Sequence, residues 1–428
     1  MQGTVKTGQR ADMKDRTTLR EDCDRIVAES IRRVQPDAAV RRALQGKDFG
    51  AGRLITVAVG KAAWSMARTA AEILGSRMDG GVVITKYGHA QGPIPPLTVR
   101  EAGHPVPDEN SFSATAEALT MTAQLRAEDT VLFLLSGGGS ALFEFPLIEP
   151  AELRDITGQL LASGADIVEM NTVRKRLSAV KGGRFAAHCA PARVFSIVLS
   201  DIIGDPLDMI ASGPAYPDGS SCADAQAVAD KYALRLSPHA QDCLRRETPK
   251  HLENVETQIT GSVRELCAAA ADTCRTLGYD VQLLTDCLDC EAREAGRVLA
   301  SIARSHRHTD RALAFLAGGE TVVHLTGKGL GGRNQEIALA AAEKLDGIPN
   351  VAVFSFGSDG TDGPTDAAGG FADGATAEAL RRQGLRIGDV LRQNDAYHAL
   401  QRVGGLIVTG PTGTNVNDAA LVLIRPED

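Results

Sequence analysis

Glycine-rich turns follow several apolar segments of this 428-residue sequence, and they hold residues suited to binding anions. In VAVGKAA, Gly60 ends an apolar run and Lys61 follows at the expected start of a helix. A lysine in a first helical turn opposes the helix dipole, whereas an anion bound there is favoured. We therefore expect Lys61 to act on a bound anion and not merely to be a solvated surface lysine.

A second glycine turn lies in LLSGGGSALFEFP, where Gly137, Gly138 and Gly139 stand between Ser136 and Ser140. Consecutive glycines let backbone N–H groups approach an oxyanion, and the two hydroxyl groups add donors. The segment matches neither a Walker A loop nor the GxGxxG fingerprint. We expect it to hold an anionic group at the end of a strand.

Basic residues are concentrated in MNTVRKRLSAVKGGRFA. Helical spacing would place Arg174, Leu177, Lys181 and Arg184 on one stripe, which Gly182 and Gly183 interrupt. Such a stripe is either a solvated face or a carboxylate or phosphate site, and RNA contact is disfavoured because no aromatic residues interleave. The segment, which also contains Asn171, is therefore a candidate carboxylate or phosphate site, and the solvated face stays open as the alternative.

Acidic and amide side chains gather in loops rich in glycine, proline and threonine. Aspartates in such loops are either turn formers or ligands of a hard cation such as Mg²⁺ carried on a nucleotide. Their spacing does not fit an EF-hand, which needs a later bidentate Glu. The candidates are Asp201, Asp205, Asp208, Glu320, Arg333, Asn334, Glu336, Asp359, Asp362, Asp366, Asn415, Asn417 and Asp418.

Anion-binding loops, cations and Mg²⁺-compatible carboxylates together are the parts that phosphoryl transfer requires. The nine histidines are scattered and show no HExxH spacing. Cys287 and Cys290 form the one close cysteine pair, a weak metal or redox signal because structural zinc needs four ligands.

The elements that must position these residues alternate between strands and helices, which indicates βα units and a mostly parallel sheet with helices on both faces. Expected strands cover residues 54–60, 80–86, 130–136 and 193–201, and expected helices cover 19–44 with a break at Pro36, 60–74, 109–125 and 152–161. Farther on, we expect helices at 263–279 and 333–345, strands at 280–286 and 350–360, a hairpin over 312–327 and a closing strand pair at 404–410 and 419–426.

The length exceeds one hydrophobic core, so two domains are expected. A charged, proline-bearing segment at 248–256 suggests the division: a flexible tail at 1–18, a first domain at 19–250 and a second at 251–428. The net charge of −8 argues against general nucleic-acid binding. No leader or membrane-length apolar run is visible, and the cysteines are not densely spaced, so a cytoplasmic protein is expected.

Read in order, VAVGKAAWSMA, LLSGGGSALFEFP, NTVRKRLSAVKGGRFA, LSDIIGDPLDMIASGP, LAGGET, GLGGRNQEIALA, GSDGTDGPTDAAG and GPTGTNVNDA resemble the class II glycerate 2-kinases, and the second half resembles their MOFRL domain. The resemblance implies ATP- and Mg²⁺-dependent phosphorylation of D-glycerate to 2-phosphoglycerate. It implies a larger Rossmann-like, doubly wound parallel-sheet domain and a smaller mixed-sheet MOFRL domain, with the active site in the interdomain cleft. Members of that family commonly pair as homodimers, but the oligomeric state of this chain is left open.

The family's proposed key lysine and arginine correspond to Lys61 and Arg333, which would stabilise the transferred phosphoryl group. Asp201 and Asp359 would hold Mg²⁺, or one of them would take the proton from the substrate hydroxyl; the sequence leaves both roles open. Candidate substrate- or phosphate-binding residues are Ser136, Gly137, Gly138, Gly139, Ser140, Asn171, Arg174, Lys181, Glu320, Asn415 and Asp418.

The alternative activity is NAD(P)H-dependent hydroxypyruvate reduction, a label that members of this family often carry. The sequence disfavours it, because no GxGxxG follows an early strand and no acidic residue stands about twenty residues beyond such a motif. A non-catalytic anion sensor is a second alternative, but it would not need Lys61, Arg333 and the acidic loops together.

Overall fold

The computed structural model describes residues 5–426, with side chains described from Thr18 onward. The chain divides into two compact units. We call Pro36–Thr260 the central unit, and we call the chain up to Gln35 together with the chain from Gly261 the composite unit. No helix in the described part of the chain is both long and apolar enough to cross a membrane.

The central unit is built on a six-stranded sheet with the order β3-β2-β1-β4-β5-β6. Its strands are β1 (Leu54–Val59), β2 (Gly80–Lys86), β3 (Leu97–Ala102), β4 (Thr130–Leu135), β5 (Arg193–Leu199) and β6 (Val255–Gly261). The pairs β3–β2, β2–β1, β1–β4 and β4–β5 are all parallel. This order and direction define a doubly wound Rossmann-like sheet, so the predicted fold class is confirmed.

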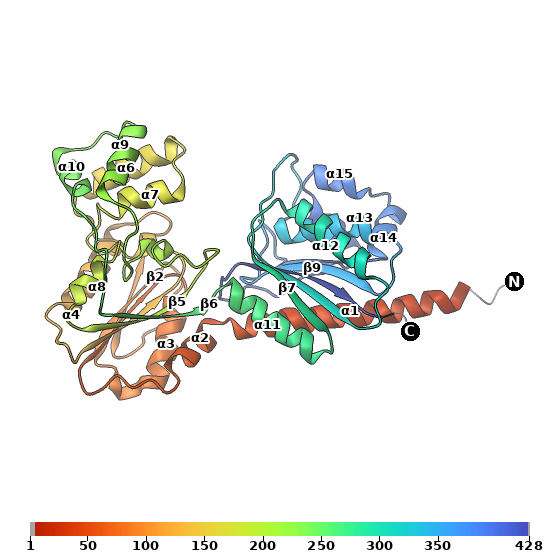
Figure 1. Cartoon of the computed structure of the whole chain (residues 1–428), viewed down its shortest axis with the longest axis horizontal. Coiled ribbons are helices and arrows are strands. Elements are labelled where there is room, and N and C mark those ends of the chain that lie inside the picture. The colour runs from red at the N-terminus through yellow and green to blue at the C-terminus, as the bar shows by residue number, and fades with distance from the viewer. Residues whose placement is uncertain (1–4, 427–428) are drawn as a thin grey trace. The chain divides into compact units, whose positions relative to one another are not determined.

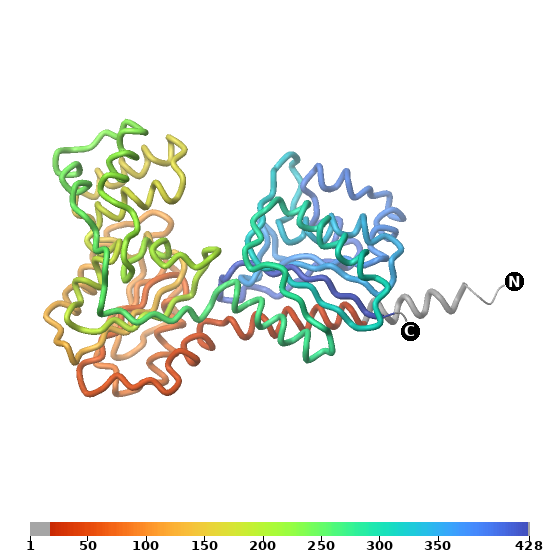
Figure 2. The backbone as a smooth tube through the Cα atoms, viewed as in Figure 1, coloured from red at the N-terminus to blue at the C-terminus, as the bar shows by residue number. Residues whose placement is uncertain are grey.

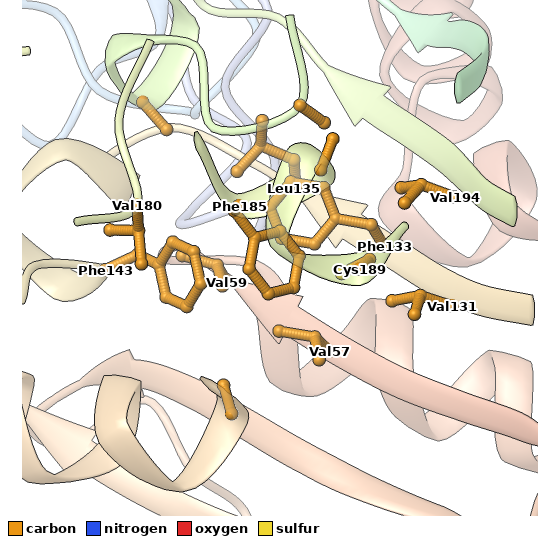
Figure 3. Close-up of a cluster of buried hydrophobic side chains, with 14 of the residues drawn as sticks. Val57, Val59, Val131, Phe133, Leu135, Phe143, Val180, Phe185, Cys189 and Val194 are labelled. Carbon is orange, nitrogen blue, oxygen red and sulfur yellow. The ribbon is translucent and has the colours of Figure 1, made fainter. Parts of the chain in front are cut away.

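Alternating side chains along the central strands pack into a core on each face of that sheet. Val57 and Val59 lie on one face with Phe133, Phe143 and Phe185, as Figure 3 shows. The opposite core takes Leu54 and Ala58 with apolar residues of α2 and α3. The helices of this unit are α2 (Pro36–Leu44), α3 (Ala63–Leu74), α4 (Glu109–Thr122), α5 (Gly139–Leu142), α6 (Pro150–Ala162), α7 (Ile167–Arg174), α8 (Arg184–Cys189), α9 (Cys222–Lys231) and α10 (Pro238–Leu244).

Helices α6, α7, α9 and α10 gather in one group, which Figure 1 shows, and their apolar side chains form a core of their own. The basic segment that we expected to be one helical stripe is divided here: α7 ends at Arg174, and α8 begins only at Arg184. The prediction of one helical stripe was therefore wrong, although the expected interruption at Gly182 and Gly183 is present. Gly182 and Gly183 have positive φ angles of 57° and 84°, which interrupt a helix.

The composite unit contains a mixed sheet with the order β11-β10-β9-β12-β8-β7. Its strands are β7 (Asp280–Leu288), β8 (Leu313–Gly319), β9 (Val351–Gly357), β10 (Gly369–Asp373), β11 (Leu406–Ile407) and β12 (Asp418–Ile424). Only β7 and β8 pair in parallel; the other ladders are antiparallel. The predicted second, mixed-sheet α/β domain is confirmed.

Helices cover both faces of this mixed sheet. α1 (Val5–Arg33) and α11 (Val263–Thr276) pack on one face, and α12 (Ala292–His306) and α13 (Arg333–Leu345) pack on the other (Figure 1). Three short helices, α14 (Thr376–Arg382), α15 (Ile387–Arg392) and α16 (Ala396–Arg402), pack against α13.

The structure divides the chain differently from the division suggested by composition. From residue 18 on, α1 lies beside the α11 segment (Figure 2), and its apolar residues Leu19, Ile26 and Ile31 belong to the core of the composite unit. The boundary at which the chain passes from the central unit back to the composite unit lies between Thr260 and Gly261, and not at residue 250. The predicted tail at 1–18 overlaps the start of α1, except for residues 1–4, which lie outside the described residues.

Two predicted strand pairs are wrong. β8 pairs with β7 and β12, and the segment after Gly319 contributes only an isolated bridge between Val322 and Glu291 instead of a hairpin arm. β11 pairs with β10, while β12 lies between β8 and β9. Local turn signals suggested partners close in sequence, whereas the buried sheet selects partners that are distant in sequence.

Candidate active site

Two loops of the central unit meet where β1 and β4 lie side by side. The chain leaves these strands toward opposite faces of the sheet, as at the ligand-binding switch point of doubly wound folds. Lys61 follows β1, and its N–H donates to the Gly137 carbonyl at 2.9 Å. The Ser136 N–H donates to the Val59 carbonyl at 2.9 Å, and Ser136 Oγ accepts from the Ala62 N–H at 3.1 Å. These bonds fix the lysine turn against the glycine loop, residues 136–140.

Side chains from two further loops lie over the glycine loop. A Cβ atom on Gly137 would collide with the Asp201 carboxylate, which follows β5. A Cβ atom on Gly138, whose φ is 88°, would lie 3.2 Å from Lys61 Cγ and 3.1 Å from His104 Cδ2. We call Lys61, His104, Asp201 and the glycine loop the lysine site.

His104 is the member of this site that sequence reasoning missed. It follows β3, a strand that was not predicted, and no motif marks it. The other members, Lys61, residues 136–140 and Asp201, are brought together as separate motifs at neighbouring strand ends. The structure thus gathers in one place what the sequence distributes over about 140 residues.

Buried polar side chains support the glycine loop from below. Ser140 Oγ lies 3.0 Å from Ser212 Oγ, which donates to Asn171 Oδ1 at 2.9 Å. Asn171 and Ser212 are both buried, and Ser212 has a left-handed φ of 61°. Asn171, expected to bind a ligand, thus contacts the loop through Ser212.

Lys181 is fully buried, and its ammonium group is already occupied. It donates to the carbonyls of Ser140 at 2.8 Å and Phe143 at 3.1 Å, and it lies 3.1 Å from the Glu144 carboxylate. Burial lowers the pKa of Lys181 to about 8, although Glu144 opposes this shift. Lys181 was expected to bind an anionic ligand, but its position makes it a support of α5. Arg174, which is half-buried, donates to the same Ser140 carbonyl at 3.3 Å.

A second group of predicted residues converges in the composite unit around the first residue of α13. Arg333 donates to both carboxylate oxygens of Asp418, which lies at the start of β12. Its Nε donates to Oδ2, and its Nη2 donates to Oδ1 at 3.1 Å. Its Nη1 donates to Glu320 Oε1 at 2.8 Å, and Glu320 Oε2 accepts from Asn417 Nδ2 at 3.1 Å. We call Glu320, Arg333, Asp359, Asp362, Asn417 and Asp418 the arginine site.

Burial and ion pairing oppose each other in the arginine site. Burial alone would lower the pKa of Arg333. Its hydrogen bond to Asp418 and the charges of Asp418 and Glu320 raise that pKa by more, so the net shift is upward and the guanidinium stays charged. Burial raises the pKa of Asp418 more than Arg333 lowers it. The buried Asp362 carboxylate accepts from the N–H groups of Asn334 at 3.1 Å and Gln335 at 2.8 Å, yet burial raises its pKa to about 7.

Asp359 and Asn415 lie in loops beside the arginine site. The half-buried Asp359 accepts from the Thr361 N–H at 2.9 Å, and a Cβ atom on Gly357 would lie 3.3 Å from both Asp359 Oδ1 and Asp418 Oδ1. Asn415 is exposed and accepts from the Asn417 N–H at 3.3 Å. Asp359 and Asp201, the two predicted Mg²⁺ ligands, belong to different units.

Within residues 18–426, no three His, Cys, Asp or Glu side chains form a group able to hold a metal ion. Mg²⁺ carried on a nucleotide needs only one or two carboxylates because phosphate oxygens and water supply its other ligands. The partly accessible Asp359 carboxylate, with Asp418 nearby, fits that requirement and does not form a protein cage. Cys287 and Cys290 are free and exposed.

Comparison with known proteins matches both halves of the chain. Residues 22–245 match the domain of unknown function DUF4147, and residues 313–418 match the MOFRL family. A D-glycerate 2-kinase of Thermotoga maritima is 51% identical, over 96% of this chain and 100% of the relative. A glycerate 2-kinase of Pyrococcus horikoshii is 40% identical, over 95% of this chain and 97% of that relative.

Solved structures agree with these relatives. A crystal structure of glycerate kinase from Thermotoga maritima superposes with a TM-score of 0.91 at 51% identity and covers 96% of this chain and 100% of its own. An Agrobacterium vitis relative, 38% identical over 96% of this chain and 95% of its own length, has the provisional name hydroxypyruvate reductase.

Proposed function

Because this chain belongs to the glycerate 2-kinase family with a C-terminal MOFRL domain, we propose that it transfers the γ-phosphoryl group of ATP to the 2-hydroxyl of D-glycerate. The observation that carries the proposal is the 51% identity to a D-glycerate 2-kinase over its whole length. The lysine and arginine sites supply the groups that such a transfer requires. A cytoplasmic location, where ATP and Mg²⁺ are available, and a homodimeric state are part of the proposal.

In the lysine site, we assign charge neutralisation to Lys61. Its side chain is exposed, while its backbone N–H is fixed to Gly137, so the ammonium can reach a ligand from a rigid base. The glycine loop would accept an anionic group of the substrate or donor on its backbone N–H groups. Asn171, Arg174 and Lys181 would act indirectly by holding that loop.

In the arginine site, we assign to the Arg333 guanidinium the role of a second positive charge that stabilises the transferred phosphoryl group. Three of the five N–H donors of Arg333 are engaged by Asp418 and Glu320, which fix the guanidinium plane and leave two donors that could face a phosphoryl oxygen. Asp359 would hold the Mg²⁺ of the nucleotide, which neutralises phosphate charge when bound. Asn415, which is exposed beside Asn417, would contact the nucleotide or the substrate.

We assign to Asp201 the role of the base that accepts the proton of the attacking hydroxyl. Its carboxylate lies over Gly137 in the lysine site. The substrate oxygen forms a bond to the γ-phosphorus, the bond from that phosphorus to the bridging oxygen breaks, and the hydroxyl proton passes to Asp201. Asp201→Asn would then lower kcat at saturating Mg²⁺, whereas Asp359→Asn would raise the Mg²⁺ concentration needed for half-maximal rate.

Product analysis by phosphorus NMR tests the proposal. Purified protein incubated with ATP, Mg²⁺ and D-glycerate is expected to give ADP and 2-phosphoglycerate, and a 3-phosphoglycerate resonance would contradict the assigned hydroxyl. In parallel, hydroxypyruvate and NADH are added without ATP. NADH oxidation there, with no phosphorylated product in the first assay, would replace the proposal with the reductase activity.

A further inference from the structure

We propose that His104 is a ligand-contacting residue of the lysine site, where its imidazole donates a hydrogen bond to the anionic group received by the glycine loop. The inference deepens the proposed function and rests on it for the identity of the anion. The anion is a carboxylate or a phosphoryl group, which share the same hydrogen-bonding chemistry.

The position of the His104 ring carries the inference. A Cβ atom on Gly138 would lie 3.2 Å from His104 Nε2 and 3.2 Å from Lys61 Cγ. The nitrogen edge of the imidazole and the lysine side chain therefore flank the same glycine of the loop. Only glycine leaves this approach open, because any side chain at Gly138 would meet both neighbours in a left-handed conformation.

The turn that holds His104 is itself fixed. The Gly103 N–H donates to Asp108 Oδ1 at 3.1 Å, and the same oxygen accepts from the Ser111 N–H at 3.0 Å to cap α4. Asp108 Oδ2 accepts from the Tyr87 hydroxyl at 2.6 Å. The imidazole therefore extends from a preorganised turn, which reduces the entropy lost when it binds a ligand.

The charges around His104 are mostly positive. Burial lowers its pKa first, and the charges of Lys61, Lys86 and His89 lower it further. In the described part of the chain, none of these four basic groups forms an ion pair with a carboxylate. Three carboxylates of the central unit lie close to this group: Glu101 accepts from the Ala90 N–H at 3.0 Å, Asp108 is committed to its turn, and Asp201 lies over Gly137.

Basic groups that lie together without forming ion pairs to carboxylates repel one another, and a bound anion reduces that cost. The same anion raises the pKa of His104, so the ring takes up a proton and its hydrogen bond becomes charge-assisted. A histidine remote from the bound anion would not respond in this way. A rise in pKa on adding the anion therefore places the ring beside the anion, and the kinetics of His104→Ala test the contact itself.

Histidine-selective NMR of the whole protein provides the first test. The Cε1–H resonance of His104, assigned with His104→Asn, is followed against pH alone, with inorganic phosphate and with D-glycerate. We expect its pKa to rise by about one unit with at least one anion, while the resonance of exposed His251 responds to neither anion. A response to phosphate alone assigns the phosphoryl group, and a response to glycerate alone assigns the carboxylate. No response at saturating concentrations of both overturns the inference.

Kinetics provides the second test. We expect His104→Ala to raise KM for the contacted ligand about tenfold or more, and His104→Asn, which keeps an amide donor, to restore part of it. His251→Ala is the matched control and should leave both constants unchanged. Parental kcat and KM in folded His104→Ala from pH 6 to 8 would refute the inference. If glycerate is not phosphorylated at all, the proposed function fails, and the phosphate arm of the NMR titration still decides the role of His104.

Discussion

Lys61 and Arg333 carry the same charge in opposite surroundings. Within the described residues, Lys61 forms no ion pair, whereas Arg333 is held by both oxygens of Asp418 and by Glu320. The charge of a cation without a carboxylate partner is not offset by a neighbouring negative charge, so it attracts a bound anion more strongly. A cation that is already paired contributes mainly the fixed orientation of its remaining N–H donors. At the residue scale, Lys61 is therefore the position most sensitive to loss of charge.

We expect Lys61→Met to lower kcat at least about 100-fold, because the role proposed for Lys61 is to neutralise developing phosphoryl charge. The fold should persist, since the Lys61 side chain is exposed. ADP release and far-UV circular dichroism measure the two effects. Lys231→Met, at an exposed position of α9, is the control and should retain the parental rate. A folded Lys61→Met protein with full activity would exclude Lys61 from catalysis.

Among the elements, α5 depends on a buried ion pair. The ends of this short helix are held by Lys181, whose charge is balanced by a fully buried Glu144. Removing one partner of a buried pair leaves the other charge without compensation, which costs more than the pair itself contributes.

We therefore expect Lys181→Met to destabilise the central unit by about 3–5 kcal/mol and Glu144→Gln to restore part of that loss in the double variant. Urea unfolding followed by fluorescence of Trp64, the single tryptophan, reports on this unit. If the losses of the two single variants simply add in the double variant, the side chains are not coupled and this interpretation is incorrect.

The first turn of α13 has a different dependence, on the protonation of Asp362. Its pKa is about 7 in the folded chain, so the folded state retains a proton that the unfolded state releases. The stability contributed by this proton is complete below about pH 4 and is lost as pH rises through 7. Well above pH 7 both states have released the proton and the contribution no longer changes.

We expect the difference in unfolding free energy between the parent and Asp362→Asn to fall by up to about 4 kcal/mol from pH 4 to pH 7. Urea unfolding followed by circular dichroism at several pH values measures this difference. Parallel pH profiles of the two proteins would show that Asp362 does not bind the proton.

At the scale of the whole molecule, the first helix and the last strands form one core. Ile26 is fully buried in the composite unit, with Phe354 and Leu421 in the same cluster. The composite unit therefore needs both ends of the chain, and the central unit is inserted between them in the sequence.

Ile26→Ala should destabilise the composite unit by about 2–5 kcal/mol through loss of buried volume, without shifting the Trp64 transition. Val57→Ala, in the core of the central unit, should shift that transition. Circular dichroism and Trp64 fluorescence recorded on the same urea series separate the two units. A Trp64 shift in Ile26→Ala equal to that in Val57→Ala would show that the units unfold together.

Local sequence determined the features that depend on near neighbours. Apolar periodicity predicted α1, α3, α4, α11 and α13, and the ends of apolar runs marked Lys61, the glycine loop and Asp201 as strand-end residues. The resemblance to the glycerate 2-kinases gave Arg333, already a candidate from its loop, a role on the transferred phosphoryl group. These predictions needed no knowledge of which segments pair, because helical spacing and glycine turns act within a few residues.

Tertiary structure alone decided the features that depend on distant partners. Strands β3, β6 and β10 have too little local apolar pattern to be recognised, so His104 at the end of β3 could not be connected to Gly138. Lys181 reads as an exposed cation in the sequence, but folding buries it against Glu144 and two carbonyls. Burial and strand pairing arise from contacts between residues that are far apart in the chain, so they cannot be predicted from local propensity.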